Sequence, residues 1–273
     1  MKIMVHRFTT SGRPLLCLHG LARGGVDFMN MKPLLEKRWA MYALDFHGHG
    51  ESERRPGHYL VTDYIPDAIT ALDVVFRERG EPVTLLGHSL GAMVALAVAG
   101  EAPDKVRAAV LEDPPFHTMG NRIGQTIYQA QFTGTREVAR AGGDVPTLAA
   151  NLAAVRIPAA GGGFTTFGQT RSPEALLASA AYLARVDPEI FTPPIEARWL
   201  DGYDREAMFA RARCPILLMQ GDPATGAALT DEDVALARRV TADCRHVMVA
   251  GAPHQIHATQ PEKVAALVNE FGG

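Results

Sequence analysis

Short runs of apolar residues alternate with longer amphipathic stretches along this chain. The apolar runs are of strand length and show no polar alternation, as expected for strands that are covered on both faces. They lie at residues 15–18, 41–44, 83–86, 108–111, 216–219 and 245–249. Helical patterns occupy residues 61–79, 92–100, 231–240 and 262–271. This alternation predicts an α/β protein with a doubly wound, mostly parallel sheet, in which ligands bind beyond the carboxyl ends of the strands.

The alternation stops between residues 114 and 205. Two proline pairs and a run of three glycines punctuate this segment, and helical patterns recur at residues 123–133, 145–155 and 173–185. A structureless segment of this length is unusual inside a compact domain. We therefore predict a core made of residues 1–113 and 206–273, with an inserted helical cap over residues 114–205.

The composition favours a soluble protein with one sizeable core. The chain has 273 residues, 47% of them hydrophobic, and a net charge of −3 with interspersed signs. These values give no reason to expect a nucleic-acid or acidic-membrane partner. We also expect no membrane span, since no apolar stretch reaches about 18 residues, and no signal peptide. Three widely spaced cysteines fit reduced thiols in a cytoplasmic protein. The sequence does not define the oligomeric state.

The pentapeptide Gly87-His88-Ser89-Leu90-Gly91 follows one of the apolar runs and precedes an alanine-rich helical stretch. A serine at such a strand–turn–helix junction lies on a sharp elbow, with its hydroxyl exposed above the sheet. Glycines are needed on either side because side chains there would collide with the neighbouring strand and helix. The pentapeptide alone is a weak signal, but its context makes Ser89 the candidate nucleophile.

A serine nucleophile needs a base and a group that orients the base. His254 follows the last apolar run and precedes the last helix, so it is expected at the same end of the sheet as Ser89. Histidine suits this role because its pKa lies near working pH. His257 is the alternative base. We favour His254 because small residues before it form a tight turn after the strand.

The oxyanion that develops when serine attacks a carbonyl needs preorganised hydrogen-bond donors. One candidate is the backbone N–H of Leu90, at the N-terminus of the helix after the nucleophile. The second is the backbone N–H of Leu21, in the loop after the first clear apolar run. Each such donor lowers the barrier by about 3 kcal/mol. His19, in the same loop, is expected to shape the turn rather than to act as an acid.

Taken together, these motifs resemble those of the α/β-hydrolase superfamily. The resemblance rests on residues 18–21, 45–52, 87–91 and 251–254, which occur in the family's order and at its usual spacing. It covers residues 10–112 and 210–273 and implies a Ser–His–acid triad, a helical cap after the sixth family strand and no cofactor. The segment at 45–52 is implied to be turn structure beside the site. His47, His49 and Asp45 lack further ligands, so no metal is expected.

The acid of the triad is where this chain departs from the family pattern. The usual Gly-x-x-Asp turn after the seventh family strand reads Gly221-Asp222-Pro223-Ala224 here, so the expected position holds alanine. Some family members place a glutamate after the sixth strand instead, and Glu112 matches that position. A carboxylate at the end of an apolar strand is costly unless it is paired. We therefore expect Glu112 to be the acid, with Asp222 and Asp113 as alternatives.

The predicted activity is hydrolysis of a carboxylic ester or lactone through an acyl-enzyme intermediate. The partner would be a small apolar substrate, because the cap supplies aromatic and aliphatic side chains that can pack or line a pocket. These are Phe116, Ile123, Ile127, Tyr128, Phe132, Phe164, Phe167, Tyr182, Phe191 and Trp199. The chain length of the acyl group cannot be read from the sequence.

Three alternatives share the scaffold. Hydrolysis of a carbon–carbon bond in a vinylogous diketone would call for basic residues that hold a substrate carboxylate, and Arg122, Arg156 and Arg171 are candidates in the cap. Amide hydrolysis would call for an acidic cluster there, but the acidic residues of the cap are scattered. A non-catalytic small-molecule-binding protein is the third alternative, because a fold does not determine a function.

Overall fold

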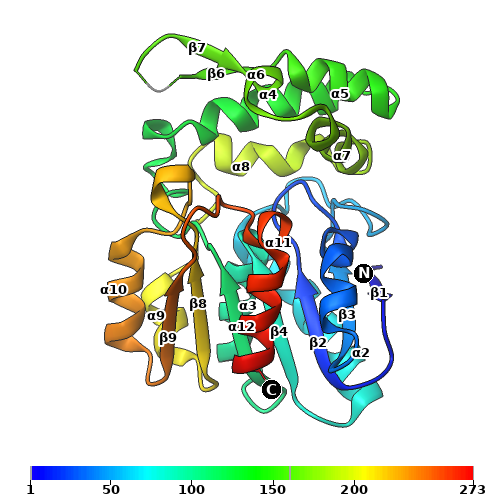
Figure 1. The fold of residues 1–273 in the computed structure, drawn as a ribbon, viewed down its shortest axis with the longest axis vertical. Helices are drawn as coiled ribbons and strands as arrows, with labels where there is room; N and C mark the ends of the chain where they lie inside the picture. Colours follow the sequence, from blue (N-terminus) through cyan, green and yellow to red (C-terminus); the bar gives the residue numbers. More distant parts are fainter. Residues whose placement is uncertain (1, 160, 273) are drawn as a thin grey trace.

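The structure, a computed structural model, describes residues 2–159 and 161–272 (Figure 1). Seven strands within this part of the chain form one sheet with the order β1-β3-β2-β4-β5-β8-β9. They are β1 (Met4–Arg7), β2 (Arg13–Leu18), β3 (Trp39–Asp45), β4 (Val83–His88), β5 (Val106–Glu112), β8 (Ile216–Gln220) and β9 (Cys244–Met248). All neighbours pair in parallel except β1, which runs antiparallel to β3. The predicted fold class is confirmed, with β1 as an additional edge strand.

Helices cover both faces of this sheet. One apolar cluster joins the sheet to α2 (Ile65–Arg79), α3 (Leu90–Glu101), α9 (Arg205–Arg211) and α10 (Asp231–Val240). The second joins the other face to η1 (Gly25–Met31), α1 (Lys32–Leu35) and α12 (Pro261–Phe271), and α12 stands in front of the sheet in Figure 1. Successive residues of β2 alternate between the clusters, as the two-residue period of a strand requires. Short turns of helix complete this part: η2 (Val61–Tyr64), η5 (Pro223–Thr225) and α11 (Ile256–Thr259).

Local sequence explains where the main helices begin and end. The predicted helix at 61–79 starts as the 3₁₀ turn η2 and continues as α2. The Asp63 carboxylate accepts the Leu60 N–H at 2.9 Å, and α2 ends at Gly80, whose φ of 70° lies in the left-handed region. By contrast, α3 is apolar on all sides and buried from Leu90 to Ala99, as expected for a central helix.

The segment between β5 and α9 lies over the carboxyl edge of the sheet (Figure 1). It contains η3 (Ile123–Gln125), α4 (Tyr128–Ala141), α5 (Val145–Ala153), α6 (Phe167–Thr170), α7 (Pro173–Leu183), η4 (Pro188–Phe191) and α8 (Thr192–Ile195). It also holds an antiparallel pair, β6 (Arg156–Pro158) with β7 (Phe164–Thr166), which the expectation of a mostly helical cap did not include. The glycines at 161–163, all with positive φ, lie between these strands and allow the chain to reverse. We call residues 114–205 the cap, and its boundaries remain a prediction.

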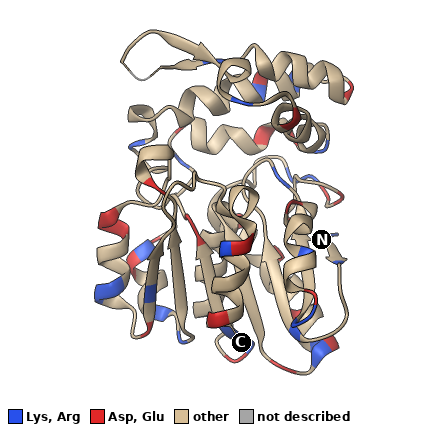
Figure 2. Ribbon diagram, viewed as in Figure 1, with Lys and Arg blue, Asp and Glu red and all other residues tan. Residues whose placement is uncertain are grey.

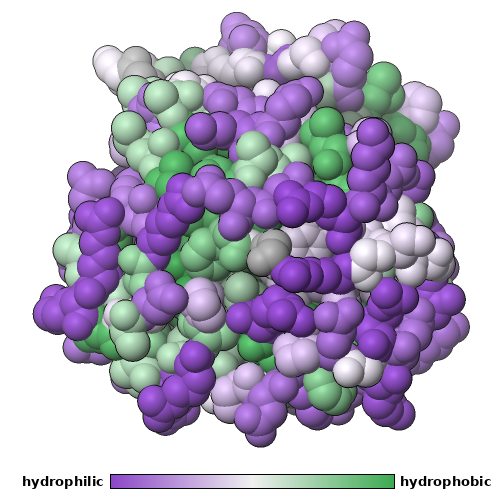
Figure 3. All heavy atoms as spheres, turned by 60° about the horizontal axis from the view of Figure 1, so that its bottom comes forward, coloured by the Kyte–Doolittle hydropathy of each residue, from purple (hydrophilic) through white to green (hydrophobic). Residues whose placement is uncertain are grey.

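Charge is distributed over the whole surface. Basic and acidic residues are interspersed on both the core and the cap in Figure 2. The face in Figure 3 is a mosaic, with hydrophilic side chains projecting between the hydrophobic ones. In the part of the chain that the structure describes, no helix combines the length and the apolar character needed to cross a bilayer.

Candidate active site

Ser89 lies on the turn that joins β4 to α3. Its φ of 53° and ψ of −114° are unusual for a residue with a side chain, and such conformations cost roughly 1–3 kcal/mol and cluster at functional sites. The flanking glycines permit the turn. A Cβ at Gly87 would lie 2.2 Å from the carbonyl oxygen of Gly91, and one at Gly91 would lie 2.0 Å from that of Leu18. The Ser89 N–H donates to the carbonyl of Glu112 at 2.9 Å, which ties the turn to the end of β5.

His254 is bonded to Asp113. Nδ1 of His254 lies 2.6 Å from Oδ2 of Asp113, whose side chain is fully buried. The same carboxylate accepts three backbone N–H groups, from Gly221 at 3.1 Å, Ala228 at 2.7 Å and Leu229 at 3.2 Å. These three bonds and the bond to His254 hold the Asp113 carboxylate in place. Because Nδ1 of His254 faces the carboxylate, Nε2 is the candidate base, and this role remains a prediction.

This pairing corrects the expectation for Glu112. Glu112 is fully buried at the last position of β5, and its carboxylate binds His257 instead of His254, with 2.9 and 3.0 Å to Nδ1 and 2.9 Å to the backbone N–H. Adjacent residues of a strand face opposite sides of the sheet. Asp113 has left the strand with a φ of 44°, so its carboxylate turns toward His254 while that of Glu112 faces His257.

The carboxylate of Asp222, the second alternative, binds backbone N–H groups and not His254. Its carboxylate accepts the N–H of Ala224 and of Gly251, both at 2.9 Å. The first bond caps the 3₁₀ turn η5 and the second joins this turn to the loop after β9. Asp222 thus supports the loop before His254 without contacting the imidazole in the structure.

His257, the alternative base, is a buried cation. Its Nε2 faces Oδ2 of Asp27 at 3.3 Å, and its Nδ1 faces Glu112. Burial alone would lower the pKa of His257, but the Glu112 charge and the hydrogen bonds to Asp27 and Glu112 outweigh it and raise the pKa to about 10. An imidazole that stays protonated at neutral pH cannot accept a proton from serine, which argues against His257 as the base; the role of His254 remains a prediction.

Two neutral histidines shape the loop that carries Leu21. His19 accepts the N–H of Phe46 at Nε2 (3.1 Å) and donates from Nδ1 to its neighbour's carbonyl (2.8 Å). His49 accepts the N–H of Ala22 at Nε2 (3.2 Å) and donates from Nδ1 to the carbonyl of His47 (3.0 Å). Burial lowers the pKa of both rings. His19 therefore serves as a turn-shaping residue, as expected.

Leu90 is the first residue of α3, where backbone N–H groups have no partner within the helix. The loop of Leu21 lies against this helix end, because the Gly91 N–H donates to the carbonyl of His19 at 3.1 Å. Both N–H groups are thus at the same end of the sheet, and their oxyanion role remains a prediction.

The segment at 45–52 forms a turn held by two carboxylates. Asp45 accepts the N–H of Gly25 at 2.6 Å and of Glu51 at 3.0 Å. His47 donates from Nδ1 to Asp67 at 2.7 Å, and its Nε2 donates to the carbonyl of His58. Within residues 2–159 and 161–272, no group of three or more metal-ligating side chains is assembled.

Sequence reasoning missed several residues beside His254. His88 packs its ring 4.7 Å from that of His254 and donates from Nε2 to the His254 carbonyl at 3.1 Å. Burial lowers the pKa of His88 well below its ordinary value, and the nearby His254 and His257 act in the same direction. His88 directly precedes Ser89 in the pentapeptide, and this position was the feature of the sequence that could have indicated a place near the site.

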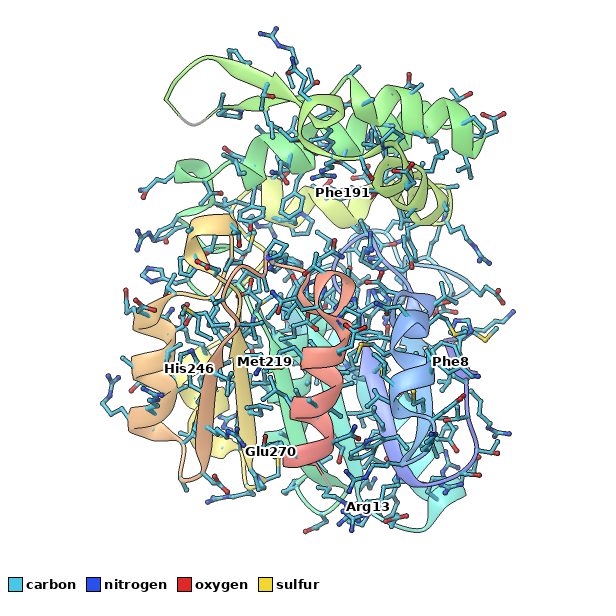
Figure 4. All side chains as sticks on the ribbon, in the orientation of Figure 1. Phe8, Arg13, Phe191, Met219, His246 and Glu270 are labelled. Carbon is cyan, nitrogen blue, oxygen red and sulfur yellow. The ribbon has the colours of Figure 1, made fainter. Side chains whose placement is uncertain are left out.

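The cap brings an aromatic row to His254. The ring of Tyr128 lies 6.2 Å from His254, and its hydroxyl donates to the carbonyl of Gly226 at 3.0 Å. Phe132 follows at 6.3 Å from Tyr128, and Phe191 at 6.1 Å from Phe132. Figure 4 labels Phe191 on the side of the cap that faces the sheet. Tyr128 and Phe132 are partly buried and Phe191 is fully buried, so this row packs the cap beside His254.

Arg23 contacts Gln255, the residue after His254. It binds Asp27 through Nε and Nη2 at 2.6–3.1 Å, and its guanidinium lies 4.5 Å over the ring of Tyr182 in the cap. With its amide oxygen turned toward these donors, Gln255 accepts from the same guanidinium at 3.2 Å. Arg23 thus connects the loop of Leu21, the loop of His254 and the cap.

The three cap arginines singled out from the sequence differ in their surroundings. Arg122 bonds to His117 at 3.0 Å. Arg156 is exposed and lies 4.5 Å over Phe164. Arg171 is half-buried, 3.6 Å over Phe167, and has no carboxylate partner among the residues that the structure describes. Burial and then the charge of Arg23 lower the pKa of Arg171, so the two guanidinium groups lie within electrostatic reach of each other.

Comparison with known proteins assigns the family. Residues 13–249 match the model of the alpha/beta hydrolase fold family, and the chain belongs to this family. It is 36% identical over 104 residues to a serine hydrolase-like protein of Danio rerio, a match that covers 37% of this chain and 31% of that protein. The chain thus aligns with about a third of the length of that relative.

Two further similarities span nearly the whole chain. A 2-(acetamidomethylene)succinate hydrolase of Mesorhizobium japonicum is 27% identical over 267 residues, covering 96% of this chain and 88% of the relative. The crystal structure of an enol-lactonase from Burkholderia xenovorans superimposes with a TM-score of 0.72 at 17% identity, covering 98% of this chain and 95% of that one. The second similarity is one of fold.

Proposed function

We propose that this protein is a serine hydrolase that cleaves a carboxylic ester or lactone through an acyl-enzyme intermediate. The observation that carries the proposal is the bond between His254 Nδ1 and the buried Asp113 carboxylate, at the same edge of the sheet as the strained turn of Ser89. A nucleophile on an elbow, an oriented imidazole and a buried acid are the parts that acyl transfer needs.

In this mechanism the Ser89 hydroxyl attacks the substrate carbonyl while His254 takes its proton. The N–H groups of Leu21 and Leu90 stabilise the resulting oxyanion. The tetrahedral intermediate then collapses: the bond to the leaving oxygen breaks, and His254 donates its proton to that oxygen. Water, deprotonated by His254, hydrolyses the acyl-enzyme and restores the Ser89 hydroxyl. With a lactone, the leaving alcohol stays attached to the acyl group.

A second candidate is cleavage of a carbon–carbon or amide bond in a substrate that carries a carboxylate. The half-buried Arg171 without a carboxylate partner, together with Arg23, favours it, because guanidinium groups bind carboxylates well. The relative from Mesorhizobium japonicum, whose name specifies a succinate derivative, supports the same candidate. The acidic residues of the cap are dispersed and give no such support to recognition of a substrate amine.

The deciding experiment compares wild type with Ser89→Ala on a panel of p-nitrophenyl esters, lactones, a vinylogous diketone and a carboxylate-bearing amide. We expect ester or lactone turnover that the variant loses almost completely. Labelling of Ser89 by a fluorophosphonate probe should be lost in parallel. Wild type that neither turns over any of these compounds nor reacts with the probe would instead indicate a non-catalytic small-molecule-binding protein.

A further inference from the structure

The two carboxylates that follow one another at the end of β5 bind two histidines that are three residues apart. Asp113 holds His254, and Glu112 holds His257. The second pair lies in the interior, with both side chains fully buried. The pair takes no part in the proton transfer described above. Its polar side-chain atoms face each other and the carboxylate of Asp27.

The Glu112–His257 pair is joined to the loop of His254 by more than one bond. The Glu112 carboxylate accepts both the side-chain and the backbone N–H of His257. Asn30 donates to the carbonyl of His257 at 2.7 Å. The segment from 254 to 257 is thereby held at its far end by β5 and η1.

The ring of His88 links this anchoring to His254. The ring of His88 lies 5.1 Å from that of His257 and 4.7 Å from that of His254, so it is packed between them. Phe28 covers the other side of His257 at 4.8 Å. The carbonyl of Glu112 also accepts the N–H of Ser89, so one residue contacts both the nucleophile's backbone and the loop of the base.

The charges around the pair balance. The imidazolium of His257 lies between the carboxylates of Glu112 and Asp27, and the guanidinium of Arg23 binds the second carboxylate. Two positive and two negative groups thus form a continuous chain. Breaking a buried ion pair by removing one partner leaves an uncompensated buried charge, which is strongly destabilising, so we expect the segment around the pair to rearrange.

We propose that Glu112 is a positioning residue, which fixes the His254 loop relative to Ser89 through its buried pair with His257. This inference rests on the proposed serine-hydrolase function. Asp113 orients the ring of His254 through its hydrogen bond to Nδ1. Glu112 instead fixes the position of the loop that carries His254.

The test is Glu112→Gln, which keeps the side chain's size and one acceptor for the His257 N–H but removes the charge. Misplacing a catalytic group by about 1 Å can cost about 100-fold, so we expect kcat to fall about 10–100-fold with KM within about twofold. The matched control is Glu78→Gln, which removes an acid that binds Tyr42 and Arg7 at the edge of the molecule. It should leave kcat unchanged.

His257→Gln and the double variant complete the design. If the pair acts as one unit, the double variant should lose no more than the more impaired single variant. Should these variants not fold, Asn30→Ala tests the same anchoring at an exposed side chain, with a smaller loss of kcat and the same unchanged KM. Fluorophosphonate labelling of Ser89 should slow in step with kcat.

Unchanged kcat in folded Glu112→Gln would overturn the inference. So would a loss that only follows the fraction of unfolded protein, measured by thermal melting in the same buffer. Either result is distinguishable from failure of the proposed function, because in that case wild type itself shows neither turnover nor labelling of Ser89.

Discussion

Asp113 and His254 lie 141 residues apart in sequence, and the buried carboxylate of the first is 2.6 Å from Nδ1 of the second. Asp113 reaches this position because it follows the last residue of a central strand with a left-handed backbone conformation. Three backbone N–H groups from the segment after β8 hold its carboxylate. The Asp113 carboxylate is thus held by backbone groups after β8 as well as by the imidazole of His254.

Asp113→Asn is expected to lower kcat by about 10⁴-fold, because the amide cannot hold the Nδ1 proton and the base takes the wrong tautomer. Asp222→Asn is the matched control, since Asp222 bonds to backbone N–H groups only. Steady-state kinetics on the best ester would check both. A large loss in Asp222→Asn with near-full activity in Asp113→Asn would contradict the assignment.

Gly91→Ala should destabilise the protein strongly. The added methyl group would lie 2.0 Å from the backbone carbonyl of Leu18, which cannot move without disturbing β2. Overpacking typically costs about 1–3 kcal/mol and occasionally more. Gly124→Ala is the control, because its nearest neighbour is the end of the Gln129 side chain at 3.6 Å. Thermal melts of the two variants should differ clearly, and equal melting temperatures would refute the close packing at the elbow.

Stability should fall at alkaline pH because of His257. Its pKa is raised from about 6.5 in the unfolded chain to about 10 in the folded protein. A raised pKa contributes stability that is complete below the unfolded value and is lost as the pH rises through the folded value. The free energy of unfolding should therefore decline between pH 7 and pH 10, as measured by urea denaturation.

His257→Gln should flatten this decline, since the groups that face the ring, Glu112 and Asp27, then lose their titrating partner. His246→Gln serves as the control. Burial lowers the pKa of His246, so its contribution changes below neutral pH. A wild-type decline that persists unchanged in His257→Gln would show that another group causes it.

The Arg171→Gln substitution should affect substrates that carry a carboxylate and leave neutral substrates unaffected. We expect KM for esters that carry a carboxylate to rise about tenfold. This rise corresponds to the loss of one charge-assisted hydrogen bond of roughly 1.5 kcal/mol. KM for neutral esters should not change. Arg156→Gln is the matched control, because Arg156 also lies over a phenylalanine ring but is exposed. An equal change for both substrate types, or the same change in Arg156→Gln, would count against a carboxylate-binding role.

The sequence predicts the central strands well because their apolar runs are continuous. The edge strand β1 was not predicted because its four residues, two apolar followed by two polar, form no longer apolar run and stay partly or fully exposed. The β6–β7 hairpin was not predicted because Ile157 is the only buried residue within the two strands, β6 and β7, and the glycines between the strands look like a break in the sequence. Burial on both faces leaves a signal in a sequence, whereas a short solvent-exposed hairpin leaves hardly any.

At the site, the order of strands and loops was sufficient to place Ser89 and His254 at one edge of the sheet. It could not tell Glu112 from Asp113. Which of two adjacent carboxylates faces which histidine depends on the residue at which β5 ends and on the φ of 44° that follows. Neither the last residue of β5 nor the backbone angle that follows can be inferred from the residue types, since aspartate and glutamate are both compatible with either position.

Because these two carboxylates are adjacent in sequence, the pairing at the end of β5 depends on the number of residues in the strand more than on which acid stands at each position. Removing one residue there would bring Asp113 to the position that faces His257, and adding one would bring Glu112 to the position that faces His254. We therefore expect such a length variant to keep both acids and both histidines and still lose one of the two pairs.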